Sequence, residues 1–251
     1  MSSWASRRKA VYASLVVIIL AAALGLPTFF FVYKAPSCFD GIQNGNEQGI
    51  DCGGSCTKLC QSAFLAPAVS WTRFKAVAPG LYNVAAYIVN PNQNAEATGT
   101  PYHMALYDAK GMLIADTYGQ MTIPPRRDAL AFQGAVAVGN RLPARAFFEF
   151  TAAPNWFVAG DPLSALSISR KDYKENQDGS SLQVTLSNAS VVPLGPLSVA
   201  VVLFDQHGDA LDFSKTIVDQ VPANGSADAP FTWPESHHGA VVSIAVLPVA
   251  E

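Results

Sequence analysis

Two different hydrophobic patterns divide the chain. Residues 10–33 form a run of 24 residues without a charged side chain. From residue 68 onward, apolar positions alternate with polar ones, and β-branched and aromatic residues stand between short turn sequences. The uninterrupted run predicts one helix, and the alternation predicts an all-β region.

The apolar run predicts a transmembrane helix, because a helix of this length spans roughly 36 Å and a hydrocarbon core is about 30 Å thick. Basic residues occupy positions 7–9, whereas only Lys34 follows the run closely. The positive-inside rule therefore places residues 1–9 in the cytoplasm and the remainder outside the cell membrane. A cleaved signal peptide is the alternative, but its apolar core is shorter, about 7 to 15 residues. The length of the run favours a single-pass signal anchor in contact with the lipid bilayer through residues 10–33.

All four cysteines lie in one 23-residue stretch just after the apolar run, at Cys38, Cys52, Cys56 and Cys60. Clustered thiols can bind zinc, but zinc sites usually have paired spacings, and the predicted location is oxidising. We therefore expect two disulfides in a module at 34–65, with three possible pairings. The module is too small to be held together by an apolar core, so the bridges must stabilise it.

A twelve-residue segment between the first two cysteines resembles a calcium loop. Asp40, Asn44 and Asp51 fall at positions 1, 5 and 12 of the EF-hand pattern, and Asn46 supplies another amide oxygen. Ile42, however, occupies position 3, where a ligand is expected. These four polar residues are the candidate ligands of a structural calcium ion. The alternative is that Asn and Gly form turns here and Asp caps them.

The segment 38–60 is also similar to a cysteine-rich module, C-x-DG-x-x-NG-x-E-x-G-x-DCGG-x-C, that recurs in bacterial envelope and surface proteins. This resemblance implies an exported, disulfide-bearing spacer or recognition module. It implies no activity.

An internal repeat organises the remaining chain. When the sequence is shifted by 97 or 98 residues, Asn90 aligns with Asn188, and the aromatic-Asp pair ending at Asp108 aligns with the pair ending at Asp205. Each copy contains about seven short strands, the size of an immunoglobulin or fibronectin-type sandwich. We expect two tandem β-sandwiches, at 66–152 and 163–251. A linker at 153–162 should separate two independently folding domains with limited mutual contact.

The repeat carries a family resemblance. Residues 104–108 (Met-Ala-Leu-Tyr-Asp), with Gly111 and the Pro124-Pro125 turn, resemble the central motif of the FxLYD family of bacterial extracytoplasmic domains, apart from Met in place of Phe. Residues 202–205 with Gly208 match more loosely. The resemblance covers most of residues 67–250. It implies a β-sandwich that serves as an accessory or binding domain, with no catalytic residues to carry over.

Catalytic motifs are missing from the sequence, which has no G-x-S-x-G elbow, no H-E-x-x-H and no phosphate-binding loop. Asp108 and Asp205 each precede a glycine by three residues, which predicts structural turns. His237 and His238 are the only adjacent histidines, and we interpret them as solvated turn residues. Exposed tryptophans can stack on sugars, but core packing is the ordinary role of these side chains. The tryptophans considered for a sugar-binding face are Trp71, Trp156 and Trp233.

Charge further limits the function. Of the 16 basic residues, four precede residue 35, whereas all 19 acidic residues follow it. The external portion is therefore acidic and has no polybasic patch for nucleic acid. The leading hypothesis is a non-enzymatic scaffold that binds another envelope protein. A glycan-binding surface protein is the alternative, and a metal-dependent hydrolase is a weaker third.

Overall fold

The computed structural model describes residues 4–32, 35–177 and 179–251, so the expected helix end at Tyr33 lies outside the described residues. One long helix, α1 (Trp4–Val32), covers the apolar run. Within it, Ser6–Phe29 has a mean hydropathy of 2.3 and is long and apolar enough to cross a membrane. A membrane anchor and a signal sequence both have these properties.

Residues 1–56 and residues 57–251 form two compact units. The second unit contains a short 3₁₀ helix, η1 (Gln61–Ala63), and is otherwise built from antiparallel strands. Its first strands are β1 (Ala68–Ala78), β2 (Leu81–Val89), β3 (Ala95–Tyr107), β4 (Leu113–Ile123), β5 (Ala129–Ala137), β6 (Arg145–Phe150) and β7 (Phe157–Val158). They are followed by β8 (Leu166–Asn176), β9 (Gly179–Asn188), β10 (Leu197–Phe204), β11 (Ala210–Val218), β12 (Ser226–Trp233) and β13 (Ser243–Ala250).

The strand connectivity repeats. Strands β1–β6 form the sheets β1-β2-β5 and β4-β3-β6, and strands β8–β13 form β8-β9-β12 and β11-β10-β13 in the same order. The register irregularity between Val69 and Trp71 also recurs between Ile168 and Arg170. We call β1–β6 the first copy and β8–β13 the second copy. With β7, which pairs with β3, the sheets of the first copy contain seven strands, whereas those of the second copy contain six.

Each copy encloses its own core, because alternate residues of its central strands point between its two sheets. In the first copy, Met104 and Leu106 on β3 lie in one buried cluster with Val84 and Ile88 on β2. The second copy has the corresponding cluster around Val199, Val201 and Leu203 on β10 and Leu182, Val184 and Leu186 on β9.

The residues that revealed the repeat make equivalent hydrogen bonds. The buried Asn90 amide donates to the carbonyl of Pro124 at 2.7 Å, and the buried Asn188 amide donates to that of Pro222 at 3.1 Å. Each asparagine therefore ties its loop to the loop before its β5 or β12 strand.

The two turn aspartates are also equivalent. Asp108 Oδ1 accepts from the backbone N–H groups of residues 110 and 112, and Asp205 Oδ1 accepts from those of 207 and 209, all at 2.8–2.9 Å. The N–H of Asp209 is the first cause that lowers the pKa of Asp205 below its ordinary value. These bonds match the predicted turn role of both aspartates.

Part of the segment 153–162, which was predicted to be a linker, packs against the first copy. Trp156 is 1% exposed and belongs to the first copy's core, where its ring centroid lies 5.3 Å from that of Phe64. Its carbonyl accepts from the N–H of Leu59 at 2.8 Å, and β7 pairs with β3. Residues 57–65 therefore fold together with the first copy.

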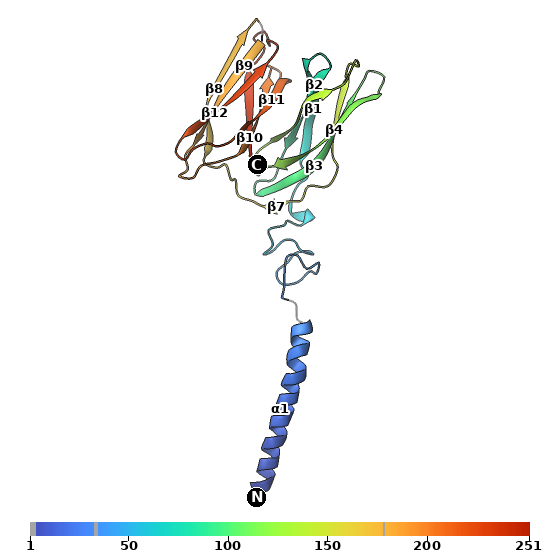
Figure 1. Cartoon of the computed structure of the whole chain (residues 1–251), viewed down its shortest axis with the longest axis vertical. Coiled ribbons are helices and arrows are strands. Elements are labelled where there is room, and N and C mark those ends of the chain that lie inside the picture. The colour runs from blue at the N-terminus through green and yellow to red at the C-terminus, as the bar shows by residue number, and fades with distance from the viewer. Residues whose placement is uncertain (1–3, 33–34, 178) are drawn as a thin grey trace. The chain divides into compact units, whose positions relative to one another are not determined.

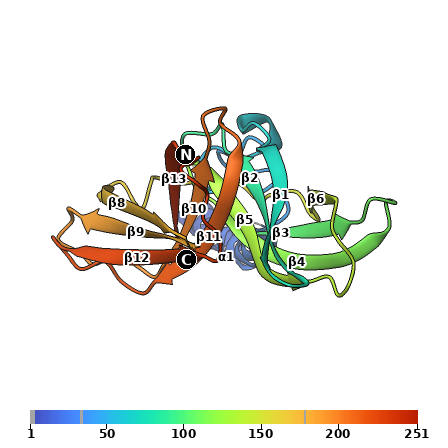
Figure 2. The same cartoon turned by 90° about the horizontal axis from the view of Figure 1, so that it is seen from above.

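The two copies are joined by a third apolar cluster, which we call the seam. Sheet β1-β2-β5 of the first copy packs on sheet β11-β10-β13 of the second, as the centre of Figure 2 shows. Phe213 lies at its middle, with ring centroids 6.0 Å from Trp71 and 6.4 Å from Phe132. The Arg73 guanidinium bonds to Asp209 at 2.5 Å across the seam. The expectation of limited contact between the copies is therefore wrong.

Where one copy has an apolar residue in the seam, the equivalent position on the outer sheet of the other copy is usually polar. On the second copy's outer sheet, strand pairing places Arg170, Asp228 and Gln183 where the first copy has Trp71, Leu130 and Ala85. On the first copy's outer sheet, Asp116, Glu149 and His103 stand where the second copy has Phe213, Leu247 and Ala200. The copies therefore pack through non-equivalent faces, and the outer sheets lie at opposite ends of the four-sheet stack (Figures 1 and 2).

We expect Phe213→Ala to lower the free energy of unfolding by about 3–5 kcal/mol, because it leaves a cavity in a buried cluster. Phe147→Ala is the matched control, since Phe147 is 43% exposed on the outer sheet of the first copy and should change stability by less than about 1 kcal/mol. Urea unfolding of the two variants provides the comparison. Equal effects would contradict a buried seam.

Candidate functional site

The outer surface of sheet β4-β3-β6 is the strongest candidate site. Residues 102, 104 and 106 of β3 point into the first copy's core, so residues 103, 105 and 107 point outward. We call this surface the open face. Its members are His103, Ala105, Tyr107, Asp116, Tyr118, Arg145, Phe147 and Glu149.

His103 is at the centre of the open face. Its ring stacks on that of Tyr118 with centroids 4.6 Å apart. Nδ1 lies 3.3 Å from a carboxylate oxygen of Glu149, and Nε2 lies 3.7 Å from one of Asp116. The imidazole is largely covered, whereas both carboxylates are about half exposed and Tyr118 is 67% exposed. The face therefore presents a fixed aromatic ring and two carboxylates to the solvent.

Cross-strand pairing explains this arrangement. His103 is directly opposite Tyr118 on β4 and Glu149 on β6, and neighbours on one face of a sheet have Cβ atoms about 5 Å apart. Next to them, the Arg145 guanidinium lies 5.2 Å from the ring centroid of Tyr107. Aromatic rings, carboxylates and a cation on one surface of a sheet suit recognition of another surface. They supply no activated nucleophile.

A second polar cluster is buried in the second copy. His237 lies between Asp212, whose carboxylate is 3.2 Å from Nε2, and the hydroxyls of Tyr173 and Ser180, which are 2.8 and 3.1 Å from Nδ1. The side chains of His237 and Asp212 are only 4% and 3% exposed. The interpretation of His237 as a solvated turn residue is therefore wrong. His238, by contrast, is exposed.

Glu175 completes this cluster. It accepts from the Tyr173 hydroxyl at 2.6 Å and from the backbone N–H groups of His237 and Gly239 at 3.1 and 2.8 Å. The Tyr173 bond is the first cause that lowers the pKa of Glu175, and burial, followed by this bond, raises the pKa of Tyr173. Glu175 therefore fastens the loop that carries His237 to strand β8.

The combination of Asp212, His237 and Ser180 has the residue types of a hydrolytic triad, but its bonds are committed elsewhere. Ser180 is buried and donates to the carbonyl of Glu235 at 3.1 Å. The backbone N–H groups beside the imidazole, which in a hydrolase would stabilise an oxyanion, bind Glu175. The cluster therefore stabilises the loop at 234–242 in this structure.

The first copy closes the same end without a polar cluster. Strand pairing places Phe74, Tyr82 and Ala115 where the second copy has Tyr173, Ser180 and Asp212. Phe74 and Tyr82 form an edge-to-face pair with centroids 5.9 Å apart. The fold itself therefore does not require the buried charges, which distinguish the second copy.

Three of the four predicted calcium ligands, Asp40, Asn44 and Asp51, lie close together in the first compact unit. Asp51 accepts from the N–H groups of Asp40 and Gly41, and Asp40 accepts from the N–H of Ile42 and from the side chain of Asn44. These bonds are those of capped turns. Asn44 Oδ1 is buried without a hydrogen-bond partner, whereas Asn46 is exposed. Calcium binding at this loop stays a prediction.

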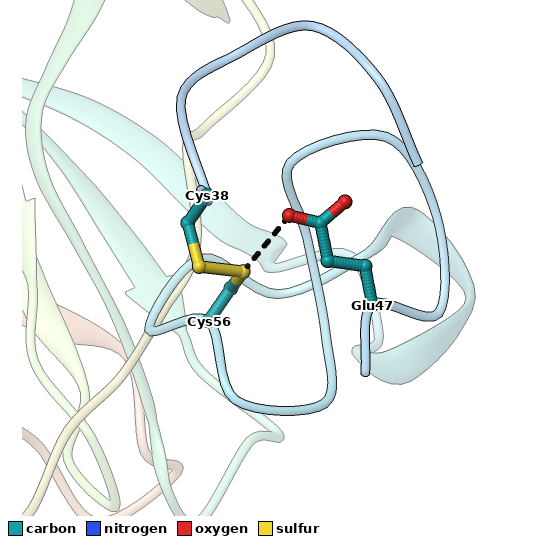
Figure 3. A group of neighbouring side chains, drawn as sticks. All are labelled: Cys38, Glu47 and Cys56. Carbon is teal, nitrogen blue, oxygen red and sulfur yellow. Dashed lines mark hydrogen bonds between the residues drawn. A yellow bond between two sulfur atoms is a disulfide. The ribbon is translucent and has the colours of Figure 1, made fainter. Parts of the chain in front are cut away.

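Disulfides are confirmed in the cysteine-rich module. Cys38 bonds to Cys56, and Cys52 and Cys60 are also disulfide-bonded. Figure 3 shows Glu47 beside the first bridge, with a carboxylate oxygen 3.4 Å from the Cys56 sulfur. Cys38, Glu47 and Cys56 are the one compact group of three metal-ligating types among the described residues. The two cysteine sulfurs are joined in a disulfide and so offer no thiolate to a metal.

The three tryptophans do not form a sugar-binding face. Trp156 and Trp233 are buried in separate cores, and Trp71 packs in the seam. No sequence pattern predicted the open face, because its residues come from three strands and become neighbours only through pairing. The buried Asp212 was missed for the same reason, since it looks like one charge in an alternating strand.

Comparisons with known proteins identify no family. No family model matches, and no curated protein matches. Among solved structures, a beta-galactosidase candidate from Bacteroides fragilis is 10% identical with a TM-score of 0.24, over 69% of this chain and 33% of its own. A beta-glucuronidase of glycoside hydrolase family 2 is 6% identical with a TM-score of 0.21, over 86% of this chain and 29% of its own.

A third solved structure is the N-terminal CBM22-1–CBM22-2 tandem domain of Paenibacillus barcinonensis Xyn10C, 8% identical with a TM-score of 0.15 over 74% of this chain and 86% of its own. This chain spans about a third of the length of the first two proteins. At these TM-scores the likenesses carry no argument about function.

We expect His237→Leu to lower the free energy of unfolding by about 3–5 kcal/mol, because it leaves the Asp212 carboxylate buried without its partner. Adding Asp212→Ala, the residue type at the equivalent position in the first copy, should recover part of the loss. His238→Gln is the control and should change stability by less than about 0.5 kcal/mol. Urea unfolding of Asp212→Ala, His237→Leu, the double variant and His238→Gln tests the coupling, and strictly additive losses from the two single variants would exclude it.

Proposed function

We propose that this chain is a non-enzymatic, membrane-anchored extracytoplasmic binding protein that presents two tandem immunoglobulin- or fibronectin-like β-sandwiches to another envelope protein. In this proposal α1 holds the chain in the bilayer with its N-terminus in the cytoplasm. The disulfide-bonded module serves as a spacer between the anchor and the β unit.

The anchor proposal is supported by the length of the apolar run and by the basic residues at positions 7–9. The sandwich proposal is supported by the two pairs of sheets, each around its own core, and by their repeated connectivity. The resemblance of residues 104–108 and 202–205 to the FxLYD motif supports an accessory or binding role.

One observation carries the binding role. The open face is equivalent to the sheet surface through which the second copy packs in the seam, but no other described part of residues 57–251 packs on it as a sheet. Tyr118 and Phe147 are exposed on it, and Met112 and Leu113 are exposed at its edge. Aromatic residues and methionine are enriched where proteins meet. We therefore place the partner protein on the open face.

A non-enzymatic role agrees with the bonding of the Asp212–His237–Ser180 cluster, in which the hydroxyl and the neighbouring N–H groups already have partners. Glycan binding is the second candidate. It is favoured by the Tyr118 ring, which is held in place by His103 beside two carboxylates, because sugars stack on aromatic rings and bond through hydroxyls.

Photo-crosslinking in intact cells tests this proposal. A benzophenone amino acid replaces Tyr118 on the open face or, as the control, Thr185 on the outer face of β9. We expect a discrete protein adduct from position 118 that is lost with Phe147→Ala, because that change removes the neighbouring aromatic contact. An adduct that consists of carbohydrate would favour the glycan alternative. The same adducts from both positions would contradict a binding site on the open face.

A further inference from the structure

We propose that the open face receives an arginine side chain of the partner protein, an inference that rests on the proposed binding function. Three observations support it. The open face has an exposed tyrosine ring and two exposed carboxylates, and a similar arrangement holds an arginine elsewhere in the same chain.

The charges on the centre of the open face favour a cation. Asp116 and Glu149 approach the imidazole of His103 from opposite sides, and both remain about half exposed. Two carboxylates therefore share one imidazole, which leaves oxygen lone pairs directed to the solvent. A partner that brings a positive charge would satisfy them, whereas an acidic surface would be repelled.

The aromatic ring favours arginine over other cations. Tyr118 is held by its stack on His103, so little side-chain freedom is lost when a second planar group covers it. A guanidinium is planar, stacks on aromatic rings and donates in a fork that fits carboxylates, whereas the lysine ammonium is a compact, strongly hydrated charge. Tyr118 and Asp116, which lie two residues apart on the same face of β4, offer a ring and a carboxylate that suit a guanidinium.

Within residues 57–251 an arginine lies on an aromatic ring twice, once beside a carboxylate. In the seam, Arg73 lies 5.9 Å from the ring centroid of Trp71 and bonds to Asp209 of the other copy. At one side of the open face, Arg145 lies 5.2 Å from the ring centroid of Tyr107. Arginine on an aromatic ring beside a carboxylate therefore already joins one copy to the other. An arginine from a partner would repeat this contact at the open face.

A peptide-binding measurement tests the proposal. It uses the full-length protein in nanodiscs of neutral lipid and compares an arginine peptide with one peptide of the same charge and one of the same shape. The peptides are four repeats of Gly-Arg, Gly-Lys or Gly-citrulline. Citrulline keeps the planar shape without the charge, and lysine keeps the charge without the plane. We expect the arginine peptide to bind at least tenfold more tightly than the lysine peptide, and the citrulline peptide not to bind.

Variants then locate the site. We expect the double variant Asp116→Asn and Glu149→Gln to weaken arginine-peptide binding at least tenfold, and Tyr118→Ala to weaken it at least threefold. Asp228→Asn, an aspartate on the outer sheet of the second copy, is the matched control and should leave the affinity unchanged. All these residues except Asp228 lie on the open face, and thermal unfolding checks that each variant remains folded.

Three results would overturn the proposal: equal affinity for the lysine peptide, an equal loss with Asp228→Asn, or no effect of the open-face variants. The first two would show general attraction to an acidic protein. If position 118 still yields a protein adduct in cells while the arginine peptide shows no preference, the arginine inference is wrong and the binding function stands. If arginine binding occurs but no adduct forms, the proposed protein partner is wrong.

Discussion

The packing of two non-equivalent sheet surfaces in the seam is the constraint on which the rest of the β unit depends. Phe213 is buried between Trp71 and Phe132, and Arg73 adds a charged contact at the edge. Because the first copy uses sheet β1-β2-β5 and the second uses β11-β10-β13, one surface of each kind is left outside. Both outside surfaces are polar at positions where the seam is apolar. These polar positions distinguish the two outside surfaces from the seam.

The repeat provides an internal comparison for each polar feature. Asn90 and Asn188 bond alike, as do Asp108 and Asp205, so these residues belong to the common fold. The Asp212–His237 pair has no counterpart in the first copy, which closes the same end with the Phe74–Tyr82 pair. Buried charges cost desolvation that an aromatic pair avoids. The second copy thus stabilises its loop at 234–242 in a way the common fold does not need.

Much of the fold could be predicted because its signals are local. The apolar run, the alternating strands and the Asp-x-x-Gly turns each depend on neighbours in sequence, and the repeat lies in one chain. The cysteine cluster predicted disulfides, although only the structure identified the Cys38–Cys56 pairing among the three possible ones. The burial of Trp156 agrees with the core packing that is the ordinary role of tryptophan side chains.

The seam and the open face could not be predicted in this way. Phe213 and Asp116 occupy equivalent strand positions, and only tertiary packing decides that one is covered and the other faces solvent. The prediction that His237 is solvated is wrong because the imidazole pairs with the buried Asp212, which comes from a strand 25 residues earlier. Long-range contacts of this kind leave no periodicity in the sequence.

Calorimetric unfolding of residues 35–251 tests most directly whether the seam joins the two copies into one unit. A single transition, with equal calorimetric and van't Hoff enthalpies, is the result that a shared buried cluster predicts. Phe213→Asp, which introduces the residue type found at the equivalent open-face position, should divide it into two transitions. Two separate transitions in the unmodified protein would contradict a cooperative seam.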